Sequence, residues 1–234
     1  MSQVGVYSMN LNDPPLGRGS FATVRRALNT QTKQEVAAKE IYCTQEIRRE
    51  KSFSKYIEPE LRSLQNLSHP YLVKFLHAEF TDCYLYIFLE YCEKGSLDSF
   101  VKRHSLSPQL RSRFMLELAD VVEYIHQHDI IHRDIKPDNI LVKEEDGSHH
   151  IRLADLGVIK EVSNASEART ASFQGTQNWA APQLHFDLIG QKAKYSNKAD
   201  VFAVGLVYHA LINQKPGRKL KPLTGTRNLY INQY

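Results

Sequence analysis

The sequence predicts an α+β protein made of a strand-rich N-terminal lobe and a mainly helical C-terminal lobe. The strand prediction rests on three short apolar runs early in the chain, residues 35–41, 72–79 and 84–91. Residues 108–127 carry apolar side chains at the helical period, and residues 200–211 form a second strongly apolar helix. The pattern changes at residues 92–96, where we place the boundary between the lobes.

The individual elements have local support. The glycines Gly17 and Gly19 predict a turn near the start of the first lobe. Apolar residues spaced by three and four predict an amphipathic helix over residues 54–67. The helix at 108–127 has a start signal, because Ser107 suits an N-cap and Pro108 suits the first helical position. Its predicted buried face consists of Leu110, Phe114, Leu118, Val121, Val122 and Ile125.

Composition and charge exclude several classes of protein. The chain has 234 residues, 42% hydrophobic and 24% charged, which is typical of a globular protein with a sizeable core. A net charge of +4 is mildly basic and does not by itself indicate nucleic-acid binding. Three scattered cysteines fit neither a zinc site nor a disulfide framework and favour a reducing compartment. We expect a cytoplasmic or nuclear location, since no secretory or transmembrane signal is visible.

Two short motifs in the first lobe carry candidate phosphate chemistry. Gly17 and Gly19 let backbone amides approach a polyphosphate without a Cβ in the way, although a plain hairpin turn explains this motif equally well in isolation. Lys39 ends a short apolar strand, where a lysine is usually a solvated edge charge. A carboxylate partner favours a functional role, and Glu60 is the candidate because it shares the inward helix face with Leu64.

The segment at residues 131–142 carries the strongest chemical signal. It places six polar or charged groups between apolar runs, which is costly unless those groups have a function. Asp134 can accept a proton from a hydroxyl, Lys136 can neutralise a phosphoryl group, and Asn139 can bind a divalent cation. Asp155 stands between an apolar strand and a glycine and is a second oxygen ligand for such a cation, although a turn-forming aspartate would explain it in isolation.

Together these motifs resemble a eukaryotic protein kinase domain over residues 11–211. The resemblance implies a bilobal protein-kinase-like fold, in which residues 1–92 form an N-lobe with a small antiparallel β-sheet and one helix. Residues 93–212 would form a mainly helical C-lobe that lacks its last helices. Residues 213–234 are expected to be a basic tail, either loop or disordered.

The resemblance also implies a role for each motif residue. The expected catalytic residues are Asp134, as the base, with Lys136, Lys39 and Glu60. Asn139 and Asp155 match the two Mg²⁺ ligands. The expected ATP-binding residues are Gly17, Gly19, Val24, Ala37, Lys39, Glu90, Cys92 and Leu141. Within that set, the backbone of Glu90 and Cys92 would meet the adenine ring.

Several positions refine or depart from the family pattern. Lys136, two residues after the base, is similar to the serine/threonine kinase pattern, and Thr170 and Ser172 are candidate activation-loop phosphosites. Leu156 stands where the family has phenylalanine and keeps the apolar character. Gln183 replaces the glutamate of the Ala-Pro-Glu motif, which avoids an unpaired buried carboxylate if its arginine partner is missing.

The leading interpretation is an ATP- and Mg²⁺-dependent serine/threonine protein kinase that transfers the γ-phosphate of ATP to a protein hydroxyl. The alternative is a non-catalytic kinase-like module that binds nucleotide or a partner, which the short C-lobe favours. A small-molecule phosphotransferase fits the peptide-kinase segment around Gly175–Thr176 less well. We expect a protein substrate bearing Ser or Thr and a partner that covers the apolar C-lobe helix; the sequence disfavours a membrane or nucleic-acid partner.

Overall fold

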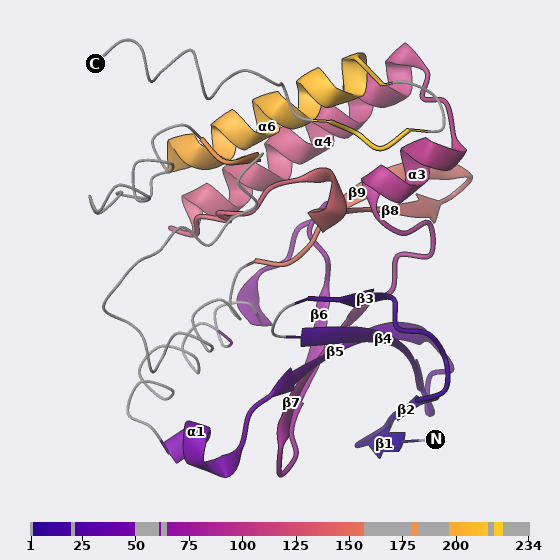
Figure 1. Cartoon of the computed structure of the whole chain (residues 1–234), viewed down its shortest axis with the longest axis vertical. Coiled ribbons are helices and arrows are strands. Elements are labelled where there is room, and N and C mark those ends of the chain that lie inside the picture. The colour runs from indigo at the N-terminus through magenta and orange to yellow at the C-terminus, as the bar shows by residue number, and fades with distance from the viewer. Residues whose placement is uncertain are drawn as a thin grey trace. The chain divides into compact units, whose positions relative to one another are not determined.

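The chain folds into two compact units in the computed structural model (Figure 1). The described residues are 2–19, 22–49, 61, 65–156, 179–181, 197–214 and 218–221. The first unit comprises Met1–Ser68, Val73–Tyr91 and Val158–Ala168. The second unit comprises His69–Leu72, Cys92–Gly157 and Arg169–Tyr234. The first is built on a β-sheet and the second mainly on helices, which confirms the predicted α+β class.

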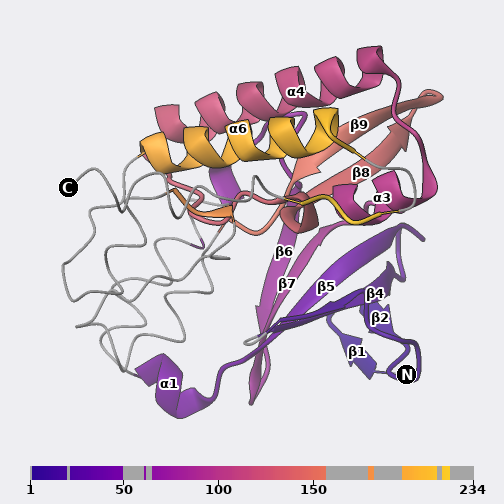
Figure 2. The same ribbon diagram turned by 45° about the horizontal axis from the view of Figure 1, so that its top comes forward.

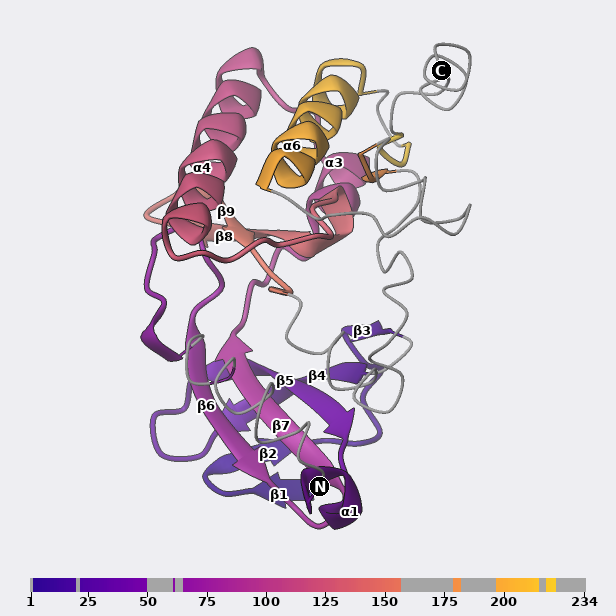
Figure 3. The ribbon, with the colours of Figure 1, turned by 90° about the vertical axis from the view of Figure 1, so that its left-hand side faces the viewer.

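The first unit is organised around one antiparallel sheet with the strand order β1-β2-β4-β5-β7-β6, and β3 pairs with β4 outside that path. Its elements are β1 Ser2–Val4, β2 Tyr7–Met9, β3 Gly17–Arg18, β4 Ala22–Asn29, β5 Glu35–Tyr42, α1 Gln45–Arg49, β6 Phe75–Phe80 and β7 Tyr84–Glu90. Three of these strands fall on the predicted apolar runs. Figure 3 shows β5 and β7 side by side in the middle of the sheet.

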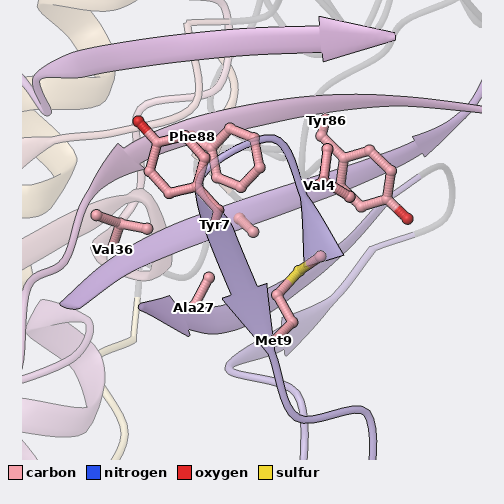
Figure 4. Close-up of a cluster of buried hydrophobic side chains, with 8 residues drawn as sticks. Val4, Tyr7, Met9, Ala27, Val36, Tyr86 and Phe88 are labelled. Atoms are coloured by element: carbon pink, nitrogen blue, oxygen red, sulfur yellow. The ribbon is translucent and has the colours of Figure 1, made fainter. Parts of the chain in front are cut away.

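The hairpin of β1 and β2, which the sequence did not predict, forms one edge of this sheet through the pairing of β2 with β4. Figure 4 shows its side chains packed against those of the central strands on one face of the sheet. The ring of Tyr7 stacks on that of Phe88, with centroids 3.7 Å apart and planes inclined by 14°. Gly5 makes the hairpin turn at a φ of 53°, a conformation that residues with a side chain rarely adopt, while the nearby Glu79 carboxylate could move away from a Cβ. The hairpin therefore depends on glycine at this position.

The other face of the sheet carries a second apolar cluster made of Ile41, Cys43, Leu61, Leu85 and Ile87. Leu61 comes from the predicted helix at 54–67, and it is buried as the amphipathic pattern required. Leu67 at the end of that helix is also buried. The remaining apolar residues predicted for this face lie outside the described residues, and so does Glu60.

The second unit contains α3 Leu97–Arg103, α4 Pro108–Gln127, η2 Pro137–Asn139, β8 Ile140–Glu145, β9 Ser148–Leu153 and α6 Asn197–Ile212. The predicted start of α4 is confirmed, because the Ser107 hydroxyl accepts a hydrogen bond of 3.1 Å from the Leu110 N–H and Pro108 opens the helix. Figure 2 shows α4 and α6 lying side by side, and the two helices contact each other.

The hairpin of β8 and β9 was not predicted, although its turn carries a clear signal. Asp146 and Gly147 connect the strands at φ values of 50° and 74°, the conformation that favours Asp-Gly in two-residue hairpins. The inward side chains of both strands are fully buried, namely those of Ile140, Val142, Ile151 and Leu153. The hairpin follows directly on Asn139 and ends two residues before Asp155, so it sets the spacing between Asp155 and residues 132–139, which we call the catalytic segment.

Part of the tail packs against the second unit. Leu220 is buried, which departs from the expectation that the tail is loop or disordered.

Trp179, the one tryptophan of the sequence, is also buried. Among the helices that the structure describes, none is both long and apolar enough to cross a membrane.

Candidate active site

The catalytic segment brings its predicted polar residues into direct contact. The carboxylate of Asp134 is buried, and its Oδ2 accepts a hydrogen bond from the Lys136 ammonium at 2.8 Å. The side-chain amide of Asn139 donates to the same oxygen at 3.0 Å and to the Asp134 carbonyl at 2.8 Å. Lys136 and Asn139, both singled out from the sequence, thus donate to one carboxylate oxygen, which fixes the orientation of Asp134.

The start of this segment is held by Asp200, which lies in the first turn of α6. Its buried carboxylate accepts hydrogen bonds from the backbone N–H groups of His132 at 2.8 Å and Arg133 at 2.9 Å. The ring of His126 on α4 lies 2.9 Å from the same carboxylate. A buried carboxylate needs such partners, and here they tie α4, α6 and the catalytic segment together.

His132 connects the catalytic segment to the strand that leads to Asp155. Its Nδ1 accepts from the Asp134 N–H at 3.3 Å, which leaves Nε2 as the protonated nitrogen, and Nε2 donates to the Ala154 carbonyl at 2.9 Å. The side chain is fully buried, and this burial lowers the pKa of His132 below its usual value. A neutral imidazole therefore bridges the residue before Asp155 and the backbone of Asp134.

The backbone adopts an unusual conformation at two of these positions. Arg133 and Asp155 have φ values of 69° and 67°, in the left-handed region that non-glycine residues rarely occupy. The hydrogen bond from the Arg133 N–H to Asp200 offsets that cost at the first position. Such conformations gather at functional sites, where the surrounding structure imposes them.

Asn139 and Asp155 have the oxygen chemistry that Mg²⁺ requires. Both hydrogen bonds of the Asn139 amide use its nitrogen, so Oδ1 is the atom able to bind a cation. The Ala154 N–H donates to the Asn139 carbonyl at 2.9 Å, which joins the backbones of the two segments. Within the described ranges, no three His, Cys, Asp or Glu side chains are placed so that they could hold a metal ion together. One carboxylate and one amide fit Mg²⁺, which also uses water and phosphate oxygens, better than they fit zinc.

The glycine motif in the first unit is short and open. Gly17 pairs with Val24 in the sheet, and the Gly19 N–H donates to the Ala22 carbonyl at 2.8 Å. Among the described residues, a Cβ at Gly17 would meet no atom within 4 Å, and one at Gly19 would meet the Ala22 carbonyl oxygen at 3.7 Å. The packing of the described residues therefore does not require glycine at these two positions, and binding of a ligand is a reason that remains for it.

The strand residues predicted to bind nucleotide share one face of the sheet. Val24 lies directly opposite Lys39, and Ala37 lies two residues before Lys39 on the same strand. Ala37 is paired with Leu89, and Lys39 is paired with Ile87. Because opposite residues point to the same side of an antiparallel sheet, these residues lie on the face that also carries Ile41 and Ile87.

The remaining predicted nucleotide residues are distributed over both units. The Glu90 carboxylate accepts a hydrogen bond from the Lys74 N–H at 2.8 Å, and the Glu90 N–H donates to the Lys74 carbonyl. Cys92 begins the 92–157 segment of the second unit and is buried, and its carbonyl accepts a hydrogen bond from the Gly95 N–H. Leu141 is half-buried on β8 beside the fully buried Val142.

The hydrogen bonds of Asp200 to the catalytic segment and its contact with His126 were not predicted from the sequence. We expected residue 200 at the start of an apolar helix, and in the structure Asp200 is also the acceptor that holds residues 132 and 133. The available signal was an aspartate inside a strongly apolar helix, since a buried carboxylate needs donors. His126 gives no comparable signal, because its contact with Asp200 joins positions far apart in the sequence.

The fold and this loop define a protein-kinase-like domain, and comparison with known families agrees. The family model described as "Protein kinase domain" matches residues 12–229. The chain therefore belongs to the protein kinase domain family, as the motifs predicted. A crystal structure of Rad53 residues 1–466 in complex with AMP-PNP matches with a TM-score of 0.68 and 26% identity, covering 88% of this chain and 48% of that one. This neighbour confirms the protein-kinase-like fold.

The proteins with similar sequences include a cell division control protein and serine/threonine-protein kinases. The chain is 35% identical over 217 residues to Cell division control protein 7 of Schizosaccharomyces pombe, covering 92% of this chain and 19% of that protein. It is 30% identical to Serine/threonine-protein kinase ATG1a of Arabidopsis thaliana, covering 97% of this chain and 34% of that protein. The chain thus spans about a third or less of the length of these relatives.

Proposed function

We propose that this domain is a serine/threonine protein kinase that transfers the γ-phosphate of ATP to a protein hydroxyl, with Asp134 as the base. The observation that carries the proposal is the convergence of Lys136 and Asn139 on the Asp134 carboxylate, at 2.8 and 3.0 Å, in a loop held by Asp200. Family membership and the serine/threonine kinase among the relatives support the reaction class.

The chain's own residues divide the work of phosphoryl transfer. Asp134 orients the substrate hydroxyl and accepts its proton, since its carboxylate is held rigidly. Lys136 places a cation beside that carboxylate, where it can neutralise charge that develops on the transferred group. Lys39, on the same sheet face as Ala37 and Val24, is the candidate to hold the ATP phosphates, with Glu60 as its proposed partner.

Nucleotide and cation would be held by separate sets of residues. The backbone at Gly17 and Gly19 would cover the phosphates, while Val24, Ala37 and Leu141 would enclose the adenine and Glu90 and Cys92 would meet its edge. Asn139 and Asp155 would hold Mg²⁺, which supplies charge neutralisation of the phosphates when bound. We propose the two units, divided near residue 92, as the N-lobe and the C-lobe of the kinase.

The test is phosphate transfer from Mg-ATP to a generic protein acceptor by the chain and by Asp134→Asn. Asparagine keeps the size of the side chain but cannot accept the proton, so we expect the rate to fall by about 10²–10⁴-fold. Phosphoamino-acid analysis of the product should show phosphoserine or phosphothreonine. A matched control is Asp138→Asn, which removes an exposed carboxylate in the same loop.

Two outcomes would contradict the proposal. Equal transfer by the chain and by Asp134→Asn would remove Asp134 from the mechanism. No transfer by a sample that melts cooperatively would favour the non-catalytic module, which nucleotide-dependent stabilisation of that same sample would then support.

A further inference from the structure

We propose that residues 218–221 form a specificity element that selects substrates with acidic residues near the phosphorylated hydroxyl. This inference rests on the proposed kinase function and names the class of its substrate. It starts from a contact between the tail and the catalytic segment. The ammonium of Lys219 lies 3.8 Å from Oδ1 of Asp138, the residue in η2 that precedes the proposed Mg²⁺ ligand Asn139.

The segment is anchored by a buried hydrogen bond. The Leu220 N–H donates to Oδ1 of Asp98 at 2.9 Å, and the other oxygen of Asp98 pairs with Lys102 at 2.8 Å. Both Asp98 and the Leu220 side chain are buried. A charge-assisted hydrogen bond away from water, together with a buried leucine, holds the backbone of the segment in one place on α3.

A second set of hydrogen bonds joins the residue Gln214, just after α6, to α3. The side-chain amide of Gln214 donates to the Val101 carbonyl at 2.9 Å and to the His104 carbonyl at 3.2 Å, at the C-terminal end of α3. Leu220 meets Asp98 in the first turn of the same helix. Gln214 therefore contacts the C-terminal end of α3 and Leu220 contacts its first turn. Helix α3 itself contacts η2. In Figures 1 and 2 the yellow residues after α6 lie beside α3.

The anchor presents a surplus of positive charge beside the catalytic segment. Arg218, Lys219 and Lys221 are exposed on either side of the buried Leu220. The cations here are these three and Lys102, while the described carboxylates that pair with them are Asp98 and Asp138. Four positive and two negative charges leave a net charge of +2 in this cluster.

The contact between Lys219 and Asp138 is easily exchanged for another. Both side chains are exposed, by 61% and 45%, and the separation of 3.8 Å is long for an ion pair, so the pair contributes little to stability. An acidic substrate residue can take the place of Asp138 at low cost. A peptide whose hydroxyl reaches Asp134 advances about 3.3 Å per residue, so its neighbouring residues pass within reach of η2 and the cluster.

The experiment measures kcat/KM for peptides with one acceptor serine in a neutral background, carrying either Glu or Lys at each position within about five residues of the serine. We expect the best Glu peptide to exceed its Lys counterpart by about tenfold, the size that two exposed charge contacts allow. The triple variant Arg218→Ala, Lys219→Ala, Lys221→Ala should bring this ratio close to one.

Two further variants separate charge from position. Leu220→Ala weakens the anchor without changing charge, and it should also lower the ratio. Arg113→Ala removes an exposed cation from α4 and should leave the ratio unchanged. A wild-type ratio near one, or an equal loss in Arg113→Ala, would overturn the inference while the kinase activity on neutral peptides would still support the proposed function.

The inference can be tested even if the chain transfers no phosphate. Fluorescence anisotropy of a labelled Glu-rich peptide should show binding that weakens with salt and is lost in the triple variant. Failure of that peptide to bind would overturn the inference independently of catalysis. Tighter binding of a single-stranded oligonucleotide of equal charge, also lost in the triple variant, would assign the surface to nucleic acid and overturn it too.

Discussion

The catalytic segment and the glycine motif differ in how they are held. His132 and Asp134 are buried, and hydrogen bonds to Asp200, Lys136 and Ala154 hold the segment in place. Gly17 and Gly19 are exposed, and their described contacts are with the neighbouring strand β4. The catalytic segment is thus held by hydrogen bonds to the residues around it, whereas the glycine motif is exposed.

The difference follows from the chemistry proposed for each motif. A base must meet a proton at a defined distance and angle, so its carboxylate has to be oriented before the substrate arrives. A phosphate-covering loop needs accessible backbone N–H groups and little else from the protein. The same contrast predicts that substitutions will mostly destabilise the fold at the first motif and mostly change ligand binding at the second.

The largest effect is expected for Asp200→Ala. It removes the acceptor of the buried His132 N–H and of the partly buried Arg133 N–H, which should lower the free energy of unfolding by about 3–5 kcal/mol. Urea denaturation followed by circular dichroism would measure the loss. Asp200→Asn keeps one acceptor oxygen and should lose less, and wild-type stability in Asp200→Ala would remove this carboxylate from the network.

A pH-dependent loss of stability is expected from His132. Its pKa is lowered by burial in the folded state, so below the usual histidine value of about 6.5 the unfolded chain binds a proton that the folded chain does not. The stability that the neutral ring contributes is complete above that pH and decreases as the pH falls toward the lowered folded value. Thermal unfolding between about pH 8 and pH 5 would measure this decrease.

The control for this pH dependence is an exposed histidine. His128→Gln on the same unit should leave the slope of Tm against pH nearly unchanged, whereas His132→Gln should flatten it. An equal flattening in both variants would mean that the slope reflects the general charge of the protein. If His132→Gln does not fold, the wild-type slope and that of His128→Gln still decide whether a buried group governs it.

A smaller effect is expected for Gly5→Ala in the first unit. The turn holds a positive φ that a residue with a side chain adopts unfavourably, so the variant should lose about 1–2 kcal/mol of stability, whereas the Glu79 side chain can move away from the added Cβ. Chemical denaturation would detect this as an earlier midpoint. A neutral result would show that the hairpin of β1 and β2 can rearrange its turn without cost.

The smallest effect on stability is expected for Gly17→Ala and Gly19→Ala. Their Cβ atoms would meet almost nothing, so stability should change by less than about 0.5 kcal/mol, while nucleotide affinity should fall. Titration with a fluorescent ATP analogue would measure the affinity and a melt would measure the stability. Unchanged affinity in both variants would leave the motif as an ordinary hairpin turn.

The parts of the fold that were predicted correctly are those with a strong local signal. The bounds of α4 followed from a capping serine, a proline and one continuous apolar face. The hairpin of β1 and β2 was missed because its strands are three residues each, too short for a periodic pattern. The hairpin of β8 and β9 was missed although Asp146–Gly147 marks its turn. The half of each strand next to the turn, residues 143–145 and 148–150, is polar on both faces, so apolar and polar residues do not alternate there.

The candidate site divides in the same way. The contacts among Asp134, Lys136 and Asn139 join residues close in sequence, so a motif was sufficient to predict that they meet. The contacts of His132 with Ala154 and of Arg133 with Asp200 join distant positions, and only the folded chain reveals them. Glu60 lies outside the described residues, and its pairing with Lys39 stays a prediction.

The burial of Trp179 has a practical consequence for following how this protein unfolds. It is the one tryptophan in the sequence, it is 7% exposed, and it belongs to the second unit. Indole emission excited at the red edge of protein absorption therefore reports on the helical unit alone, while the far-ultraviolet signal reports on both. A gap between the two unfolding curves would show that the sheet and the helices melt as separate cooperative blocks.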